Sequence, residues 1–403
     1  YELINEIKKK FESWSPAIFF GFNSIRFDEE ILRKSLFKSL FDVYITVLNN
    51  NKRADLINLV RSSVFFDKKF LKTTLTDKGN ISFKLDELAV NNGISHHAHD
   101  AIGDVLASIN LAKIIKEKKP QIWQDCLLTT NKKDVENLLY KQNIFCFCDY
   151  NFGRMNYYPL TYICSHPVYG FAQCFDLTID PKDIVKLEYS SLKKRLKEKP
   201  IFIRSIPQNK HPLIFSEDYF SYVEKLKNLD VNVLNERSSI IKFDDNFKKR
   251  IALVLNEEYD EKEYMKPQTT ILAEESLYIG GFPSVKDKLN MKNFHEAPWN
   301  EKFLISHRFE DERYKYFAQR LIYEEYPNYL PKNIFNEIHK SIANQILTLE
   351  DVNWFTLPKA YKQLDDMREK SIQEKDEEKL DFLNEINNYY EKMRLIYEPA
   401  KNL

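Results

Sequence analysis

A short stretch of histidine and aspartate, from His97 to Asp104, has residue types that can do acid–base and metal chemistry. It follows Gly93, which predicts the end of one helix, and it precedes a run with apolar residues at helical spacing. A loop histidine can take a proton from a water molecule, and a carboxylate at the start of a helix can bind a metal ion. Read alone, the stretch is explained equally well by a histidine-rich loop and by a helix dipole that favours an acid in its first turn.

A second acid follows a predicted buried strand. The apolar run 17–20 ends at Gly21, and the residues from Ser24 to Leu32 predict a helix that opens near Asp28. Open α/β sheets place their ligand sites at the carboxyl ends of strands, so Asp28 is a second candidate metal ligand. The alternative is again an acid that only complements the helix dipole.

The two stretches together carry a pair of motifs, N-x-x-x-F-D from Asn23 to Asp28 and H-x-A-x-x-D from His99 to Asp104. The pair resembles the second and third motifs of the DEDDh 3′→5′ exonucleases. The flanking sequences G-F-N-S-I-R-F-D-E-E, S-F-K-L-D-E-L-A-V-N-N-G-I and A-H-D-A-I-G-D-V-L-A-S-I are similar to the bacterial exodeoxyribonuclease I family. Residues 277–282 and the predicted helix 309–327 resemble the C-terminal domain of that family.

The resemblance implies a fold and an activity. The expected fold is an α/β RNase H-like exonuclease domain over residues 1–120, N-terminally incomplete, followed by a small SH3-like β domain with connecting helices over 121–265 and a C-terminal α-helical domain over 266–403. The expected activity is 3′→5′ hydrolysis of single-stranded DNA to 5′-mononucleotides, in DNA repair and recombination. Two Mg²⁺ ions, for which Mn²⁺ could substitute, would assist the hydrolysis.

The resemblance also implies roles for single residues. The expected catalytic group consists of Asp28 and Asp104 as metal ligands and His99 as general base. The expected DNA contacts are Asn23, Arg26, Arg53 and Lys84. The expected contacts to the acidic C-terminal tail of single-stranded-DNA-binding protein are Arg308, Arg313 and Arg320. For the last three, the charged outer face of an amphipathic helix is an equally good explanation.

One expected motif does not occur where the family would have it. The first motif, D-x-E on the first strand of the nuclease sheet, supplies two further carboxylates and should lie several dozen residues before Asn23. Residues 1–14 predict an amphipathic helix instead. We therefore expect that this sequence lacks the N-terminal part of its nuclease domain and has little or no activity alone. The alternative is an inactive module that binds single-stranded DNA or the acidic tail.

Composition narrows the class of protein further. The 403 residues carry equal numbers of basic and acidic side chains, so any DNA affinity must come from a local patch. The first 120 residues are the basic part, with 19 Lys and Arg against 15 Asp and Glu. No C-x-x-C pair occurs among the five cysteines, which favours buried thiols in a reducing compartment over a zinc site. We expect a cytoplasmic monomer without a membrane span.

The apolar pattern predicts several elements in addition. A helix over 28–40 should bury Ile31, Leu32, Leu36 and Leu40. Alternating residues from Ile144 predict small antiparallel β structure, in which Cys146 and Cys148 point to one face. Residues 201–206 and 211–215 predict a further pair of strands. A basic helix over 193–197 lies between these β segments, and a solvated helix face explains it better than a DNA contact.

Overall fold

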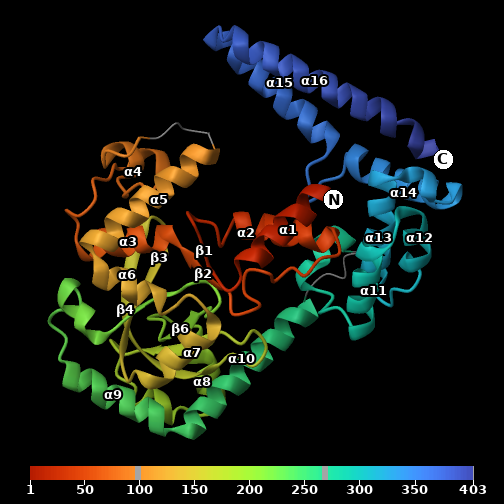
Figure 1. Ribbon diagram of the computed structural model, residues 1–403. Helices are drawn as coiled ribbons and strands as arrows, with labels where there is room; N and C mark the ends of the chain where they lie inside the picture. The colour runs from red at the N-terminus through yellow and green to blue at the C-terminus, as the bar shows by residue number, and fades with distance from the viewer. Residues whose placement is uncertain (96–100, 266–270, 403) are drawn as a thin grey trace. The chain divides into compact units, whose positions relative to one another are not determined.

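The structure, a computed structural model, describes residues 1–95, 101–265 and 271–402. Contacts between residues divide the chain into two compact units (Figure 1). The first, here called the sheet unit, consists of Glu6–Arg33 and Val43–Thr270. The second, here called the helical unit, consists of Tyr1–Asn5, Lys34–Asp42 and Ile271–Leu403. Within the described ranges, none of the helices is both long enough and apolar enough to cross a bilayer.

The sheet unit contains both helices and strands, whereas the helical unit has helices between short turns. The elements of the sheet unit are β1 Ile18–Gly21, β2 Lys52–Asp55, α3 Leu56–Phe66, α4 Leu85–Asn91, α5 Ala101–Lys118, α6 Pro120–Leu127, α7 Lys132–Lys141, β3 Phe145–Asn151, β4 Arg154–Ser165, β5 Ala172–Asp176, α8 Tyr189–Leu196, β6 Ile203–Ile206, β7 Leu213–Phe215, α9 Val231–Phe243 and α10 Asp245–Met265. The helices of the helical unit are α11 Val285–Glu296, α12 Trp299–Ser306, α13 Glu312–Glu325, α14 Lys332–Leu347, α15 Leu357–Glu374 and α16 Glu377–Tyr397. The two remaining helices, α1 Glu2–Trp14 and α2 Asp28–Lys38, contribute residues to both units.

Strands β1 and β2 form a parallel pair. The register runs from Ile18 opposite Lys52 to Gly21 opposite Asp55, so both strands end at the same edge. The helix over 1–14 and the strand at β1 confirm the sequence predictions, but the prediction that this strand is buried is wrong, because its residues are exposed or half-buried. Strand β2 was missed because its sequence, Lys-Arg-Ala-Asp, shows no apolar run, although Arg53, Ala54 and Asp55 are all buried. Tertiary pairing therefore overrides a weak local β preference there.

The second sheet has five antiparallel strands in the order β6-β5-β4-β3-β7, which confirms the predicted antiparallel β structure. The predicted pairing of 201–206 with 211–215 is wrong, because β6 and β7 lie at opposite edges of this sheet. Strand β6 pairs with β5, from Ala172 opposite Ile206, and β7 pairs with β3, from Cys146 opposite Phe215. Strands β6 and β7 are thus the two edge strands of this sheet.

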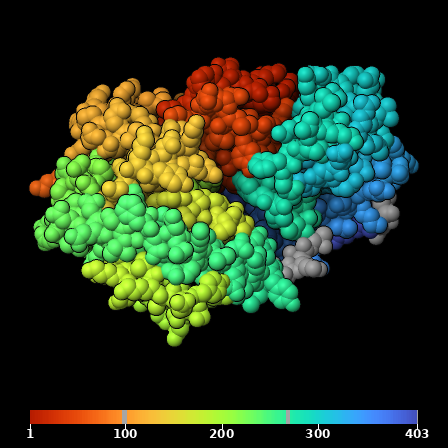
Figure 2. Space-filling view, turned by 90° about the horizontal axis from the view of Figure 1, so that it is seen from below, coloured from red at the N-terminus to blue at the C-terminus, as the bar shows by residue number. Residues whose placement is uncertain are grey.

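The five-stranded sheet is buried on both faces. Cys146 and Cys148 pack into one hydrophobic cluster, and Phe145 and Phe147 pack into another with helix α7, as the predicted alternation requires. Helices α9 and α10 pack on β4, and they form the green band on the surface seen in Figure 2. All five cysteines are free thiols, and only Cys164 is partly exposed, which confirms the prediction of buried thiols.

A single hydrophobic cluster joins the helices around β1 and β2 to the five-stranded sheet. It includes Leu59 of α3, Leu111 of α5, Cys146 of β3 and Ile251 of α10. Residues from both of the first two predicted domains therefore share one core. The division at 120 and the SH3-like character of the second part stay predictions.

The start of α2 buries charge rather than the predicted apolar residue. Glu29 and Arg33 are ion-paired at 3.1 Å and both are buried. Ile31 lies two residues from Glu29, about 200° around the helix, and is 52% exposed. The prediction that Ile31 faces the core is wrong, because the buried ion pair sets the inward face of this helix.

His211 links three parts of the sheet unit. Its ring Nδ1 accepts a hydrogen bond from the backbone N–H of Asp55 at 3.0 Å, and its Nε2–H donates to the carbonyl of Cys126 at 2.9 Å. Its own carbonyl accepts from the side chain of Asn58 at 2.9 Å. Burial lowers the pKa of His211 to about 4, so the ring is neutral at pH 7.

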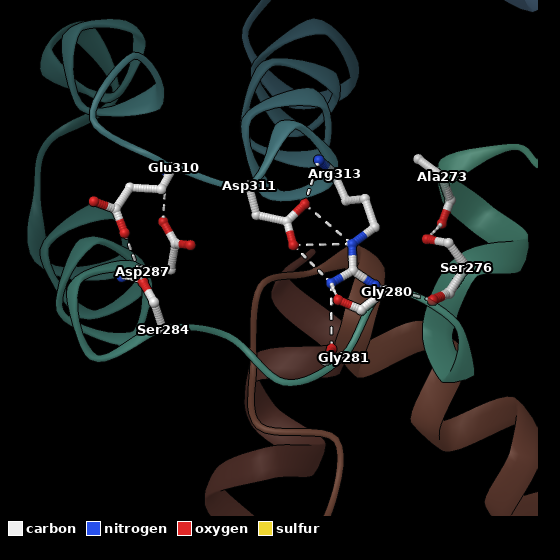
Figure 3. Close-up of polar contacts among 9 residues, drawn as sticks. All are labelled: Ala273, Ser276, Gly280, Gly281, Ser284, Asp287, Glu310, Asp311 and Arg313. Atoms are coloured by element: carbon white, nitrogen blue, oxygen red, sulfur yellow. Dashed lines mark hydrogen bonds and ion pairs between the residues drawn. The ribbon is translucent and has the colours of Figure 1, made fainter.

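Residue Arg313 of α13 organises the helical unit (Figure 3). Its guanidinium donates to both oxygens of Asp311 and to the carbonyls of Ser276, Gly280 and Gly281. A Cβ on Gly280 would clash with the guanidinium of Arg313, so glycine here lets the guanidinium approach its carbonyl acceptors closely. Gly281 has a φ of +75°, which explains the second glycine of the 277–282 sequence.

Replacing Gly280 with alanine is expected to destabilise the helical unit by about 1–3 kcal/mol, since the methyl group displaces the guanidinium from its acceptors. Urea unfolding of Gly280→Ala, Arg313→Ala and the double variant measures this effect. The substitution at 280 should cost much less in the Arg313→Ala background, where the clash is gone. An equal cost in both backgrounds would show that Arg313 is not the cause.

The buried neutral His211 predicts a pH dependence of folding. Its folded pKa of about 4 lies below the unfolded value near 6.5, so only the unfolded chain binds the proton between these values. Stability from this group is therefore complete above pH 6.5 and falls as the pH drops toward 4, by about 3 kcal/mol in total.

Urea unfolding of the wild-type chain and of His211→Asn at pH 7 and pH 5 isolates this term from the carboxylates, which both chains share. The difference in the free energy of unfolding between the two chains should shrink as the pH falls. A constant difference would mean that the imidazole titrates equally in both states.

Candidate functional site

A cavity of about 1,410 Å³ in the sheet unit brings together most of the predicted site. It lies between β1, the turn after β1, and helices α3, α4, α5 and α6. Its lining includes Asn23, Asp28, Lys84 and Asp104, which are as many as 81 positions apart in the sequence. Apolar side chains such as Phe20 and Val105 make up much of the remaining wall.

Asp28 is placed by a tight turn at the end of β1. A Cβ on Gly21 would lie 2.5 Å from the Cβ of Ser24, so the turn folds closely back on the strand end. The carbonyl of Ser24 accepts from the N–H groups of Phe27 at 3.3 Å and Glu29 at 2.9 Å, which starts α2. Asp28 is the first residue of this helix and is exposed to the cavity.

The carboxylate of Asp55 stabilises the same turn by accepting hydrogen bonds from its backbone. This side chain accepts hydrogen bonds from the N–H groups of Asn23 at 2.6 Å and Ile25 at 3.3 Å. It also caps α3 through the N–H of Ile57 at 3.3 Å. Burial raises the pKa of Asp55, and these backbone hydrogen bonds oppose that effect. Sequence reasoning missed this role, although an acid directly before an apolar helical run indicates an N-cap.

Arg53 has a structural role instead of the predicted DNA contact. It is 7% exposed, forms a buried ion pair with Glu29, and donates to the carbonyl of Asn209. Because a buried, paired guanidinium cannot reach a phosphate without breaking this network, we withdraw Arg53 from the predicted DNA contacts. The position of Arg53 in the sequence indicated correctly that it lies near the site, but it did not indicate that the side chain points into the core.

Asp104 lies in the first turn of α5 and is exposed at the cavity. The opposite side of α5 is fixed in the core by Ala107, Leu111 and Ile115. His99 lies outside the described residues, so its distance from Asp104 and its role as a base stay predictions. Carboxylate oxygens are the donors that Mg²⁺ prefers, and Asp28 and Asp104 could hold it from two walls of one cavity.

Within residues 1–95, 101–265 and 271–402, no cluster of three or more His, Cys, Asp or Glu side chains is close enough to form a metal site. The two further carboxylates of the expected D-x-E motif stay a prediction.

Basic and aromatic side chains lie close to the cavity. Lys84 is exposed at the start of α4 and is 3.4 Å from Glu87. Arg26 is exposed, and its charge lowers the pKa of Arg61, although burial is the larger cause. The Arg61 guanidinium lies 4.1 Å from the ring centroid of Tyr150. Sequence reasoning missed Arg61 and Tyr150, since neither belongs to a motif.

The three predicted tail contacts differ in the helical unit. Arg313 is committed to Asp311 and to three backbone carbonyls, so it is a structural residue and not an open contact. Arg320 is paired with Glu324 one turn further along α13. Arg308, after the end of α12, is exposed. We therefore retain Arg308 as the best placed of the three for an acidic ligand.

Comparisons with known proteins agree with this geometry. Residues 272–393 match the family model of the exonuclease I C-terminal domain. Exodeoxyribonuclease I of Haemophilus influenzae is 37% identical over 121 residues, covering 30% of this chain and 26% of that protein. Exodeoxyribonuclease I of Escherichia coli is 35% identical over 115 residues, covering 28% of this chain and 24% of that protein. The matched part thus spans about a quarter of the length of these relatives.

Solved structures match over a larger part of the chain. Exonuclease I from Methylocaldum szegediense has a TM-score of 0.74 at 23% identity, over 91% of this chain and 78% of that one. Escherichia coli exonuclease I in complex with a dT13 oligonucleotide has a TM-score of 0.74 at 20% identity, over 97% and 83%. These likenesses confirm the mixed α/β fold with a helical C-terminal part. Residues 272–393 thus match the exonuclease I C-terminal domain, and the chain is similar to exodeoxyribonucleases I in part of its sequence and in its fold.

Proposed function

We propose that this chain is the major part of a 3′→5′ exonuclease that hydrolyses single-stranded DNA to 5′-mononucleotides. The observation that carries the proposal is the single cavity that gathers Asn23, Asp28, Lys84 and Asp104. The names of the relatives support it, since they are exodeoxyribonucleases I, and one neighbouring structure is a complex with an oligonucleotide.

Hydrolysis of a phosphodiester requires a deprotonated water, neutralised phosphate charge and a stabilised leaving oxygen. In the proposed site Asp28 and Asp104 bind divalent metal, with Mg²⁺ as the natural ion and Mn²⁺ as a substitute. The bound metal, two ions in the complete site, supplies the charge neutralisation. His99 acts as the base that accepts the proton of the attacking water. Lys84, Arg26 and Asn23 hold the DNA backbone in register.

The remaining carboxylates are proposed to come from a D-x-E strand that pairs with the open edge of β1. Among the described residues β1 pairs with β2 alone. Apolar side chains of β1 and α5 that line the cavity are exposed, and a further strand would cover them. Ile18 of β1 is 46% exposed, and Val105 and Ile109 of α5 are 58% and 45% exposed. A strand there would have its carboxyl end beside Asp28, where parallel strands place their ligands.

The proposed partners are single-stranded DNA and the acidic tail of single-stranded-DNA-binding protein. A neighbouring structure is titled as a complex of exonuclease I with the C-terminal peptide of that protein, at a TM-score of 0.76 and 20% identity. Exposed Arg308 is the retained candidate for this contact. We propose further that the protein is a cytoplasmic monomer that acts in DNA repair and recombination.

The second candidate function is a binding module without catalysis. The observation that favours it is the short set of motif carboxylates at the cavity, which are Asp28 and Asp104. A chain with two ligands would bind DNA through Lys84 and Arg26 without cleaving it. The two candidates differ in whether the complete reading frame supplies the D-x-E strand.

The first test of the proposal compares the 403-residue chain with the product of its complete reading frame. We expect little or no cleavage of 3′-labelled single-stranded DNA by the former, and Mg²⁺-dependent cleavage by the latter. In the active product Asp104→Ala should lower kcat by more than about a hundredfold. Loss of a residue that only orients a metal ligand lowers activity by up to about a hundredfold, so loss of a ligand itself should have a larger effect. DNA affinity should change little.

Asp86 is the matched control, because it is also an exposed acid that lines the cavity. Asp86→Ala should retain most of the activity. Equal losses in the two variants would indicate a general effect of cavity charge, and loss of folding in Asp104→Ala would make that residue structural.

Lys84→Ala is expected to weaken binding of an oligothymidine at low salt. Each phosphate contact to single-stranded DNA contributes about 0.7 to the slope of log K against log salt, and the variant should lose about that amount. Lys78 is the matched control, because it is an exposed lysine of the preceding loop that does not line the cavity. Fluorescence anisotropy at several salt concentrations measures both variants. An unchanged slope in Lys84→Ala removes it from the interface.

A further inference from the structure

The turn between β6 and β7, residues 207–211, does not line the cavity, yet it is tied to the candidate site by two separate paths. The turn is closed by a hydrogen bond from the N–H of Lys210 to the carbonyl of Pro207 at 3.1 Å. It belongs to the sheet unit, as does the turn that leads to Asp28. The first path runs through Arg53 and the second through His211.

In the first path, the carbonyl of Asn209 accepts from the guanidinium of Arg53, which is also paired with Glu29. Glu29 is the neighbour of Asp28 in the first turn of α2. Glu29 is 7% exposed and also accepts from Thr46 and Arg33. This path therefore fixes the start of the helix that presents Asp28.

In the second path, the ring of His211 accepts from the N–H of Asp55, and the Asp55 carboxylate accepts from Asn23 and Ile25. On its other side the ring donates to the carbonyl of Cys126 in α6. An unbroken series of hydrogen bonds thus joins α6 to the turn before Asp28. Because a backbone N–H only donates and a carbonyl only accepts, the path requires the neutral tautomer with hydrogen on Nε2.

We infer that His211 is a positioning residue for Asp28, acting through Asp55 on the 23–25 turn. This inference rests on the proposed function for the identity of the site, but its geometry does not. The His211 ring accepts a hydrogen bond from the N–H of Asp55. The two carboxylate oxygens of Asp55 in turn accept from the N–H groups of Asn23 and Ile25, on the two sides of the turn. Without that hold, Asp55 could rotate and the 23–25 amides would lose their acceptors, so Asp28 would no longer be kept at one position.

Two substitutions test the two ring hydrogen bonds of His211 separately. In His211→Asn the side-chain oxygen can stand where Nδ1 stands, so the Asp55 bond is kept and the Cys126 bond is lost. Asparagine also tolerates the φ of +51° at this position. In His211→Gln the longer side chain can reach the Cys126 carbonyl, while the Asp55 N–H loses its acceptor.

The primary readout is amide hydrogen exchange of the 403-residue chain, resolved to single residues. In His211→Gln the amides of Asn23 and Ile25 should exchange about five- to tenfold faster, as expected for the loss of one hydrogen bond in a local opening. In His211→Asn they should stay within about twofold of wild type, because the Asp55 arm is kept. The amides of β5 serve as the reference for global unfolding in both variants.

Asp55→Asn gives a second and independent test. Asn23 and Ile57 share the Oδ1 atom of Asp55, whereas Ile25 donates to Oδ2. An asparagine with its oxygen in the Oδ1 position should keep the cap of α3 and speed exchange at Ile25 alone. Equal acceleration in His211→Asn and His211→Gln, or none in either, would overturn the inference.

Kinetics of the active product of the complete reading frame separate positioning from a merely structural role. His211→Gln should lower kcat about tenfold with KM for DNA within about twofold, and His211→Asn should be close to wild type. Equal losses of kcat in both variants would overturn the inference. If wild-type protein shows no cleavage while the exchange pattern is as expected, the proposed function fails and the hold on the turn stands.

Discussion

The position of the candidate site depends on one buried carboxylate, that of Asp55. Its charge is removed from water, which by itself is costly, and three backbone N–H groups compensate for this. Those donors belong to the 23–25 turn and to the start of α3, so the same interaction that stabilises the charge also joins the ends of two parallel strands. A side chain that lacks both carboxylate oxygens would leave the turn without acceptors, and Asp28 would lose its fixed position.

Support for this carboxylate comes from chain that lies more than 150 residues away in the sequence. His211 and the neighbouring carbonyl of Asn209 reach the site from the edge of the five-stranded sheet. One continuous hydrophobic cluster holds that sheet against α3 and α5, so the hydrogen bonds act between rigid elements. The β-rich part of the chain therefore contributes to the geometry of the nuclease-like part, in addition to any contact with a ligand.

In the helical unit a partly buried charge also has a structural role that resembles a binding role in the sequence. Arg313 satisfies carbonyls of the 277–282 segment, and two glycines allow the close approach and the left-handed turn that this needs. The resemblance of this segment to the family thus has a physical cause, which is the packing of a guanidinium against bare backbone. The arrangement stabilises the helical unit, and the exposed Arg308 stays the proposed contact to an acidic ligand.

Local sequence alone determined the elements whose apolar spacing is strong, namely the helix over 1–14, strand β1 and the antiparallel strands with alternating Cys146 and Cys148. It also located Asp28 and Asp104, because motifs preserve residue types at fixed spacing. Tertiary structure alone decided that Arg53 turns inward, that Ile31 turns outward and that β6 and β7 occupy opposite edges. Long-range pairing of charges and open strand edges decides such directions, and neither leaves a signal in local periodicity.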